Sequence, residues 1–445
     1  MRGVRIPFFF LLVGLACAAG LSQAPPSSPG PKLTVEDAIR LAQNNEPAFF
    51  AAAAESRVAS LERADAKAGL LPSVVFHNQY LYTQASHAKS TGSQGIAGES
   101  LPVFIANNTV HEYTSQASIN ETLGLAGVAA ARAASAKAAR AQAEYEIARR
   151  GLLATVIGLF YNAHSSGEKL AVARRALDEA NHFVEVTQER EQAGEAAHAD
   201  VIKARLSQQE RQRELADADL AKEKAYLELG VLLYPDPRTE VTLADEPAPA
   251  MLPERKDVEA AAQTNNPEIR SALASLQASQ ADTLTAWAGL LPDLALNYTY
   301  GIDAPQFASY GPDGVLNRGY SASATVDLPI WDWMTSERKV KEARIRAGAS
   351  KVALSAAQRR LLADLAEFYH EAETAQQQLA SLDASVDDAR EALHLTNLRY
   401  VNGEGTVLDV VDAQSTLVTS ENARADGLVR YHLALAQLET LTGRL

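Results

Sequence analysis

The sequence predicts a mostly helical α+β chain, in which long coiled-coil helices alternate with four short strands in an internal two-fold repeat. Three observations predict this class. Motifs occur twice in the same order, two long stretches contain no proline, and four short segments alternate with period two.

The duplicated motifs divide the chain into two repeats. Asn45-Glu46-Pro47 returns 220 residues later as Asn265-Asn266-Pro267, and an Ala-Gly-Leu-Leu-Pro segment occurs at 68–72 and at 288–292. The pattern Arg-x3-Gly-x5-Asp-Val occurs at 190–201 and again at 399–410. Ordered matches at a nearly constant offset indicate internal duplication. We therefore expect a first repeat at 33–234, a linker at 235–256 and a second repeat at 257–445.

Proline placement predicts where the long helices lie. All 18 prolines fall outside 103–234 and 330–445, and proline inside a helix removes a hydrogen bond and clashes with the preceding turn. Within these stretches, apolar positions from Leu170 to Thr187 recur at steps of three and four, and their copies run from Leu379 to Thr396. That spacing is typical of a coiled-coil seam. A single helix over 124–193 would be about 105 Å long, which favours a rod or a helical barrel.

Four short segments predict strands. They cover 72–83 and 109–122 in the first repeat, and 293–303 and 317–328 in the second. Across 294–300 the even positions are apolar or aromatic and the odd ones mainly polar, which is strand periodicity. Apolar-out, polar-in strands of about ten residues are typical of a transmembrane β-barrel. A half-buried soluble sheet gives the same alternation.

Aromatic side chains favour the membrane interpretation. They gather at strand segments and strand–helix joints, as an aromatic girdle at the membrane interfaces would. Four strands cannot close a barrel alone, because roughly eight is the smallest bacterial barrel, and lipid does not tolerate an open edge. Further copies of the chain must complete it. The candidate membrane-interface residues are Tyr80, Tyr82, Tyr298, Tyr300, Trp331 and Trp333.

The N-terminus resembles a secretory signal peptide. Arg2 and Arg5 precede a short apolar run and a small-residue exit, which predicts a signal peptide at 1–18 and a Pro/Ser-rich flexible leader at 19–32. Cys17 is the only cysteine. Lipidation of Cys17 is the alternative, although Gly14 stands where a lipoprotein signal has leucine.

The net charge of −14 argues against nucleic acid as a partner. An acidic surface repels phosphate backbones. The same charge also serves solubility.

The order helix, proline, strand pair, long helix, hairpin and helix, given twice, resembles the TolC-like outer-membrane efflux proteins. The most specific mark is Arg399-Tyr400-x2-Gly403-x5-Asp409-Val410-x-Asp412, and the resemblance runs from Leu33 to Leu445. It departs at the first strand–helix joint, where Glu121-Thr122-Leu123 stands in place of the copy's Pro329.

The resemblance implies a homotrimer in which each of three protomers lends four strands to one transmembrane β-barrel. The helices would form a coiled-coil barrel across the periplasm, with 235–256 in a belt around its middle. The implied function is a passive exit duct in the outer membrane of a Gram-negative-type cell. Its implied partners are outer-membrane lipid, a periplasmic adaptor and an inner-membrane pump of a tripartite efflux or secretion system.

The resemblance also implies a gate at the periplasmic tip of the hairpins. Asp409 and Asp412 match two aspartates that ring the constriction, where crowded carboxylates would raise one another's pKa. Tyr400 matches a tyrosine that holds the closed tip by a hydrogen bond to a neighbouring hairpin, and Asp200 matches its acidic partner. Gly405 stands where the family prototype has an arginine. The alternative is that Asp409 only caps a helix start.

No catalytic motif, cofactor site or metal site is expected. Two Glu-x-x-His pairs, Glu195/His198 and Glu367/His370, do not correspond under the repeat and would lie far apart. The alternative function class, a soluble periplasmic coiled-coil adaptor or scaffold, explains the helices but leaves the four alternating strands unexplained.

Overall fold

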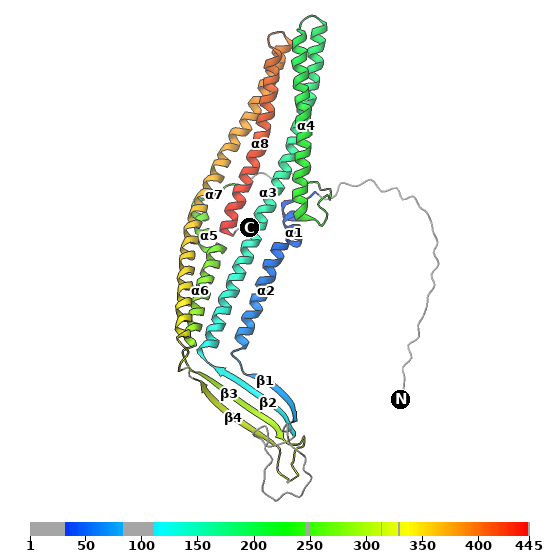
Figure 1. Cartoon of the computed structure of the whole chain (residues 1–445). Coiled ribbons are helices and arrows are strands. Elements are labelled where there is room, and N and C mark those ends of the chain that lie inside the picture. The colour runs from blue at the N-terminus through cyan, green and yellow to red at the C-terminus, as the bar shows by residue number, and fades with distance from the viewer. Residues whose placement is uncertain (1–31, 83–110, 245–249, 313, 328–329, 444–445) are drawn as a thin grey trace, which may run out of the picture.

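The computed structural model describes residues 32–82, 111–244, 250–312, 314–327 and 330–443. The chain is elongated, with a sheet at one end and the tips of two helical hairpins at the other (Figure 1). No helix in these ranges is long and apolar enough to cross a membrane. The predicted signal peptide with Cys17, nearly all of the leader, and Pro329 lie outside the described residues.

The two halves contain the same elements in the same order. The first half consists of α1 (Val35–Asn45), α2 (Pro47–Ala68), β1 (Ser73–Tyr82), β2 (His111–Leu123), α3 (Leu125–Gln192) and α4 (His198–Leu233). The second consists of α5 (Arg255–Asn265), α6 (Pro267–Ala288), β3 (Asp293–Ala304), β4 (Arg318–Asp327), α7 (Thr335–Val401) and α8 (Val407–Thr442). Helices α3 and α7 have 68 and 67 residues, so each is about 100 Å long. The predicted class, mostly helical with long coiled-coil helices and a small sheet, is confirmed.

Local sequence fixes several helix starts. The Thr34 hydroxyl accepts a hydrogen bond from the Asp37 backbone N–H at 3.2 Å. Helices α2 and α6 begin at Pro47 and Pro267, because proline fits the first helical position, where no intrahelical N–H donor is needed. The Asn266 side chain caps α6 by accepting from the Ile269 N–H at 2.9 Å.

Small and apolar side chains hold the long helices together. Helix α3 packs against α2, α6, α4 and α8. The part of α3 next to the sheet buries seven alanines, namely Ala129, Ala131, Ala133, Ala136, Ala138, Ala141 and Ala143. Further along, Leu170, Val184 and Thr187 of the predicted seam are buried. The helices α2, α3, α6 and α7 continue the strands β1 to β4 in the same lateral order.

The sheet has the order β1-β2-β3-β4, and every neighbouring pair is antiparallel. Residues opposite each other in neighbouring strands point to the same face. One such row contains Phe76, Ala117, Tyr300 and Tyr320, and the next contains Val74, Ile119, Tyr298 and Ala322. We call this side the apolar face. The other side, the polar face, carries the row Val75, Ser118, Thr299 and Ser321.

Candidate functional site at the hairpin tips

Two tight turns close the tips of the α3–α4 and α7–α8 hairpins. Gly194 and Gly403 occupy equivalent positions there, with φ of 80° and 78°. Left-handed backbone is costly for residues with a Cβ, which explains why the duplicated motif has glycine at this point. The following N–H groups turn back to the helix ends, from Glu195 to Arg190 O at 2.8 Å and from Glu404 to Arg399 O at 2.9 Å.

The two proposed gate carboxylates lie just beyond the turn of the α7–α8 hairpin. Asp409 and Asp412 are both exposed, one turn apart on α8. Asp409 also closes a capping box, because its carboxylate accepts from the Thr406 N–H at 2.9 Å while its own N–H donates to the Thr406 hydroxyl at 3.3 Å. These hydrogen bonds lower the pKa of Asp409. Asp409 therefore has the helix-capping role, which was the alternative to a gate. Within one protomer its pKa is lowered, whereas crowding with other carboxylates would raise it.

Tyr400 is buried in the contact between the two hairpins. Its ring lies 5.1 Å from the ring of Phe183, and its hydroxyl donates to the Thr187 hydroxyl at 3.3 Å. The Thr187 hydroxyl in turn donates to the Phe183 carbonyl at 2.7 Å.

Within the protomer the partner of Tyr400 is thus Thr187 and not Asp200. Tyr400 packs against α3, whereas Asp200 lies on α4, where its carboxylate is 3.7 Å from the Lys203 ammonium. Tyr400 does connect the two hairpins, but through a buried neutral hydrogen bond.

Arg190 is a tip residue that sequence reasoning did not single out. From the end of α3, its guanidinium lies over the Tyr400 ring at 4.8 Å and donates to the Tyr400 carbonyl oxygen. Its Nε also lies 3.7 Å from Glu195 Oε2. The sequence feature that could have identified Arg190 is its position as the first residue of the duplicated Arg-x3-Gly motif. Its copy Arg399 donates to the Glu404 carbonyl within its own turn, and its positive charge also helps to lower the pKa of Asp409.

The candidate membrane-interface aromatics lie along and at both ends of the sheet. Tyr80 and Tyr82 are at the end remote from the helices, and Tyr298 lies on the apolar face. Trp331 and Trp333 lie in the turn between β4 and α7, with their rings 5.8 Å apart. All of these and Tyr300 are exposed. Their role at a membrane interface stays a prediction.

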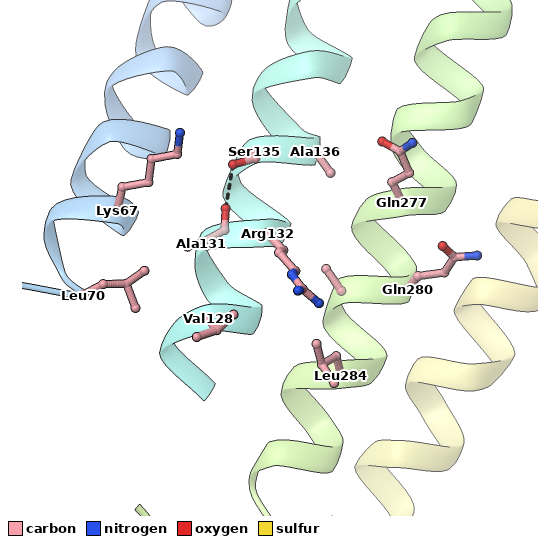
Figure 2. A pocket seen from close by; sticks show the side chains of 11 residues that line it. Lys67, Leu70, Val128, Ala131, Arg132, Ser135, Ala136, Gln277, Gln280 and Leu284 are labelled. Carbon is pink, nitrogen blue, oxygen red and sulfur yellow. Dashed lines mark hydrogen bonds between the residues drawn. The ribbon is translucent and has the colours of Figure 1, made fainter. Parts of the chain in front are cut away.

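A groove lies between α2, α3 and α6, close to the helix ends that meet the sheet (Figure 2). Its volume is about 590 Å³. Lys67 and Arg132 contribute the two cationic side chains, and the lining contains no carboxylate. The amides of Gln277 and Gln280 line the α6 side, and small or apolar side chains form the rest.

The two Glu-x-x-His pairs do not come together. His198 Nδ1 lies 2.7 Å from Glu191 Oε1 at the first hairpin tip, whereas His370 Nδ1 lies 3.6 Å from Glu373 Oε2 within α7. In the part of the chain that the structure describes, no group of three or more His, Cys, Asp or Glu side chains is placed to hold a metal ion.

Comparison with known proteins covers almost the whole chain. Residues 38–233 and 260–444 match the family described as outer membrane efflux protein. Protein CyaE of Bordetella pertussis is 26% identical over 424 residues, which cover 94% of this chain and 84% of that protein. The pyoverdine export outer membrane protein OpmQ of Pseudomonas aeruginosa is 25% identical over 442 residues, covering 98% and 88%. The crystal structure of the outer membrane protein VceC from Vibrio cholerae has a TM-score of 0.75 at 18% identity, covering 92% and 96%.

The family match includes both repeats, with their strands and long helices. This family match decides between the two function classes that the sequence left open. The alternative of a soluble periplasmic adaptor or scaffold is wrong. The chain therefore belongs to the outer membrane efflux protein family and is an outer-membrane component of efflux or secretion.

Proposed function

We propose that three copies of this chain form a passive exit duct, with a shared β-barrel in the outer membrane and a helical tunnel that closes at the hairpin tips. The observation that carries the proposal is the sheet. Its strands present one mainly apolar face, yet β1 and β4 each pair with a single neighbour among the described strands. Unpaired strand edges are not stable in hydrocarbon. Joining β4 of one copy to β1 of the next would remove every edge.

The assembly can be tested by cross-linking at the strand edges. With Val75→Cys on β1, a cysteine scanned over Gly319, Ser321 and Ser323 on β4 should give a covalent trimer at one position. A disulfide forms only when the two Cα atoms are within about 7 Å. Ser118→Cys on the interior strand β2 is the control and should give no intermolecular cross-link. Native mass spectrometry that finds only monomer in mild detergent would remove the barrel.

The proposed duct needs no catalytic step and consumes no energy itself. A periplasmic adaptor and an inner-membrane pump would deliver substrate to the tunnel at the hairpin tips. This division of labour rests on the family, and the relative OpmQ is named for export of pyoverdine.

We expect Asp409 and Asp412 to set cation preference at the tip. Rings of carboxylates in a narrow pore attract cations and repel anions. The double change Asp409→Asn and Asp412→Asn removes both charges while leaving a side-chain acceptor for the Thr406 N–H. It should weaken cation selectivity and block by multivalent cations in planar-bilayer recordings.

The control for this experiment removes two charges elsewhere. Asp217→Asn and Asp388→Asn, on exposed positions of α4 and α7, should leave selectivity unchanged. Because its capping hydrogen bonds lower the pKa of Asp409, that carboxylate should stay charged as the pH falls through the ordinary aspartate range. Unchanged selectivity in the double variant would leave these residues with the capping role alone.

A further inference from the structure

The turn between β4 and α7 exposes large apolar side chains in a constrained backbone. Ile330 is 89% exposed, Trp331 72% and Trp333 76%. Trp333 and Met334 both have φ of 60°, an uncommon conformation for residues other than glycine, and such strain is retained where the surroundings enforce it.

Hydrogen bonds from the start of α7 enforce this turn. The Ser336 N–H donates to the Asp332 carboxylate at 2.7 Å, and the Thr335 hydroxyl donates to the Asp332 carbonyl at the same distance. Arg338 donates to the Trp333 carbonyl at 2.8 Å. The two indoles are therefore held toward solvent in a fixed arrangement, although burying them would be favourable.

The turn is followed by a strongly basic segment in an otherwise acidic chain. Residues 335–351 contain six basic and two acidic side chains, a net charge of +4 where the whole chain carries −14. The basic residues are Arg338, Lys339, Lys341, Arg344, Arg346 and Lys351. Lys339 and Lys341 are exposed, and neither has an ion-pair partner within the described part of the chain.

At the same distance from the sheet, α2, α3 and α7 all carry positively charged side chains that have no ion-pair partner among the described residues. Arg344 lies 5.4 Å over the ring of Trp287 on α6. The groove of Figure 2 adds Lys67 of α2 and Arg132 of α3, again with no carboxylate in its lining. Measured along the helix axis, the basic residues from Arg338 to Arg344 lie within about 15 Å of the end of α7 that meets the sheet. Arg132 lies equally close to the sheet end of α3.

That level is where a membrane surface would lie. Strands of 10–13 residues, tilted as in outer-membrane barrels, match an apolar thickness of about 25 Å. The helix ends that join them would then lie among lipid headgroups, where tryptophan and basic side chains are both favoured.

We propose that Trp331–Arg344 forms a binding surface for anionic phospholipid headgroups on the periplasmic face of the outer membrane. The indoles would enter the interface while Arg338, Lys341 and Arg344 contact phosphate groups. A lipid with net negative charge is preferred to a zwitterionic one, whose own cation is repelled by the basic segment. This inference rests on the proposed function, because it requires the sheet to span the membrane.

The test reconstitutes the full-length channel in nanodiscs of phosphatidylcholine with or without phosphatidylglycerol. Native mass spectrometry should show that the wild type retains phosphatidylglycerol preferentially. The triple change Arg338→Gln, Lys341→Gln and Arg344→Gln should lower that preference at least about tenfold. The control triple Arg205→Gln, Arg213→Gln and Arg359→Gln removes the same charge far from the sheet and should have no effect.

A second measurement needs no charge variant. Brominated phosphatidylglycerol should quench wild-type tryptophan fluorescence more than brominated phosphatidylcholine, and Trp331→Phe with Trp333→Phe should abolish most of the difference. Equal quenching by the two lipids, or equal retention in the triple variant, overturns the proposal. Absence of quenching by either lipid also overturns it, because a second copy of the chain would then cover the turn. Oligomer mass and conductance in phosphatidylcholine alone report separately on the proposed function.

Discussion

Replacing Arg190 by methionine is expected to raise single-channel conductance several-fold in planar bilayers. Arg190 connects the α3–α4 hairpin to the α7–α8 hairpin through the Tyr400 carbonyl and the Tyr400 ring. A hydrogen bond to a charged donor contributes about 1.5–3 kcal/mol, against about 1 kcal/mol for a neutral one. Methionine retains much of the aliphatic length but none of the donors, so the hairpins would separate more easily.

Two further variants calibrate this result. Tyr400→Phe removes only the hydroxyl that reaches Thr187, and should raise conductance less than Arg190→Met. Arg190→Lys keeps the charge but not the planar, multiple-donor guanidinium, and should be intermediate. Arg399→Met is the matched control, because the hydrogen bond of Arg399 stays within its own hairpin turn and does not connect the two hairpins. If Arg190→Met and Arg399→Met conduct like the wild type, the contact is not part of a closing lock.

An arginine on the apolar face of the sheet is expected to prevent insertion, whereas one on the polar face is tolerated. Ile119 and Ser118 are neighbours on the interior strand β2 and point to opposite faces. A cationic side chain on the lipid side costs about 2–4 kcal/mol at the midplane, whereas a residue facing a water-filled lumen carries no such cost. Ile119→Arg should therefore reduce heat-modifiable oligomer in the outer membrane, and Ser118→Arg should not.

Leu296 and Asn297, which are neighbours on β3 and also point to opposite faces, would make a less suitable pair for this test. Leu296 lies directly opposite Glu121 in the neighbouring strand, and that carboxylate would partly neutralise an introduced arginine. Ile119 lies between Val74 and Tyr298, which offer no counter-charge. Equal membrane levels of Ile119→Arg and Ser118→Arg would show that the apolar face does not contact lipid.

Much of the fold follows from local sequence patterns. The absence of proline predicts α3 and α7, and alternation around Tyr298 predicts β3. The pattern of β2 is weaker, because Ser115 interrupts the apolar positions at Tyr113 and Ala117. Its placement comes from pairing with both β1 and β3, because the clearer apolar alternation of these neighbours sets which side chains of β2 join the apolar face.

The tip site was predictable only in part. The resemblance placed Asp409 and Tyr400 at the tip of the second hairpin, and the structure shows that Gly403, between them, closes that turn with a positive φ. The sequence could not identify the contact partner of Tyr400, and it favoured Asp200 by family analogy. Thr187 and Arg190 are 213 and 210 positions from Tyr400 in the chain, and no local pattern links them.

The sequence by itself therefore determined where the long helices lie, which segments alternate like strands, and that the elements occur twice. Those properties depend on backbone preferences and hydrophobic period within a few residues. Only the tertiary structure decided which side chains meet at the tip, and that two indoles remain exposed beside a basic segment. The physical reason is helical phase. An ideal helix drifts by roughly 20° per heptad relative to a seven-residue repeat, so over helices as long as α3 and α7 the facing residues depend on supercoiling and on packing against neighbouring helices.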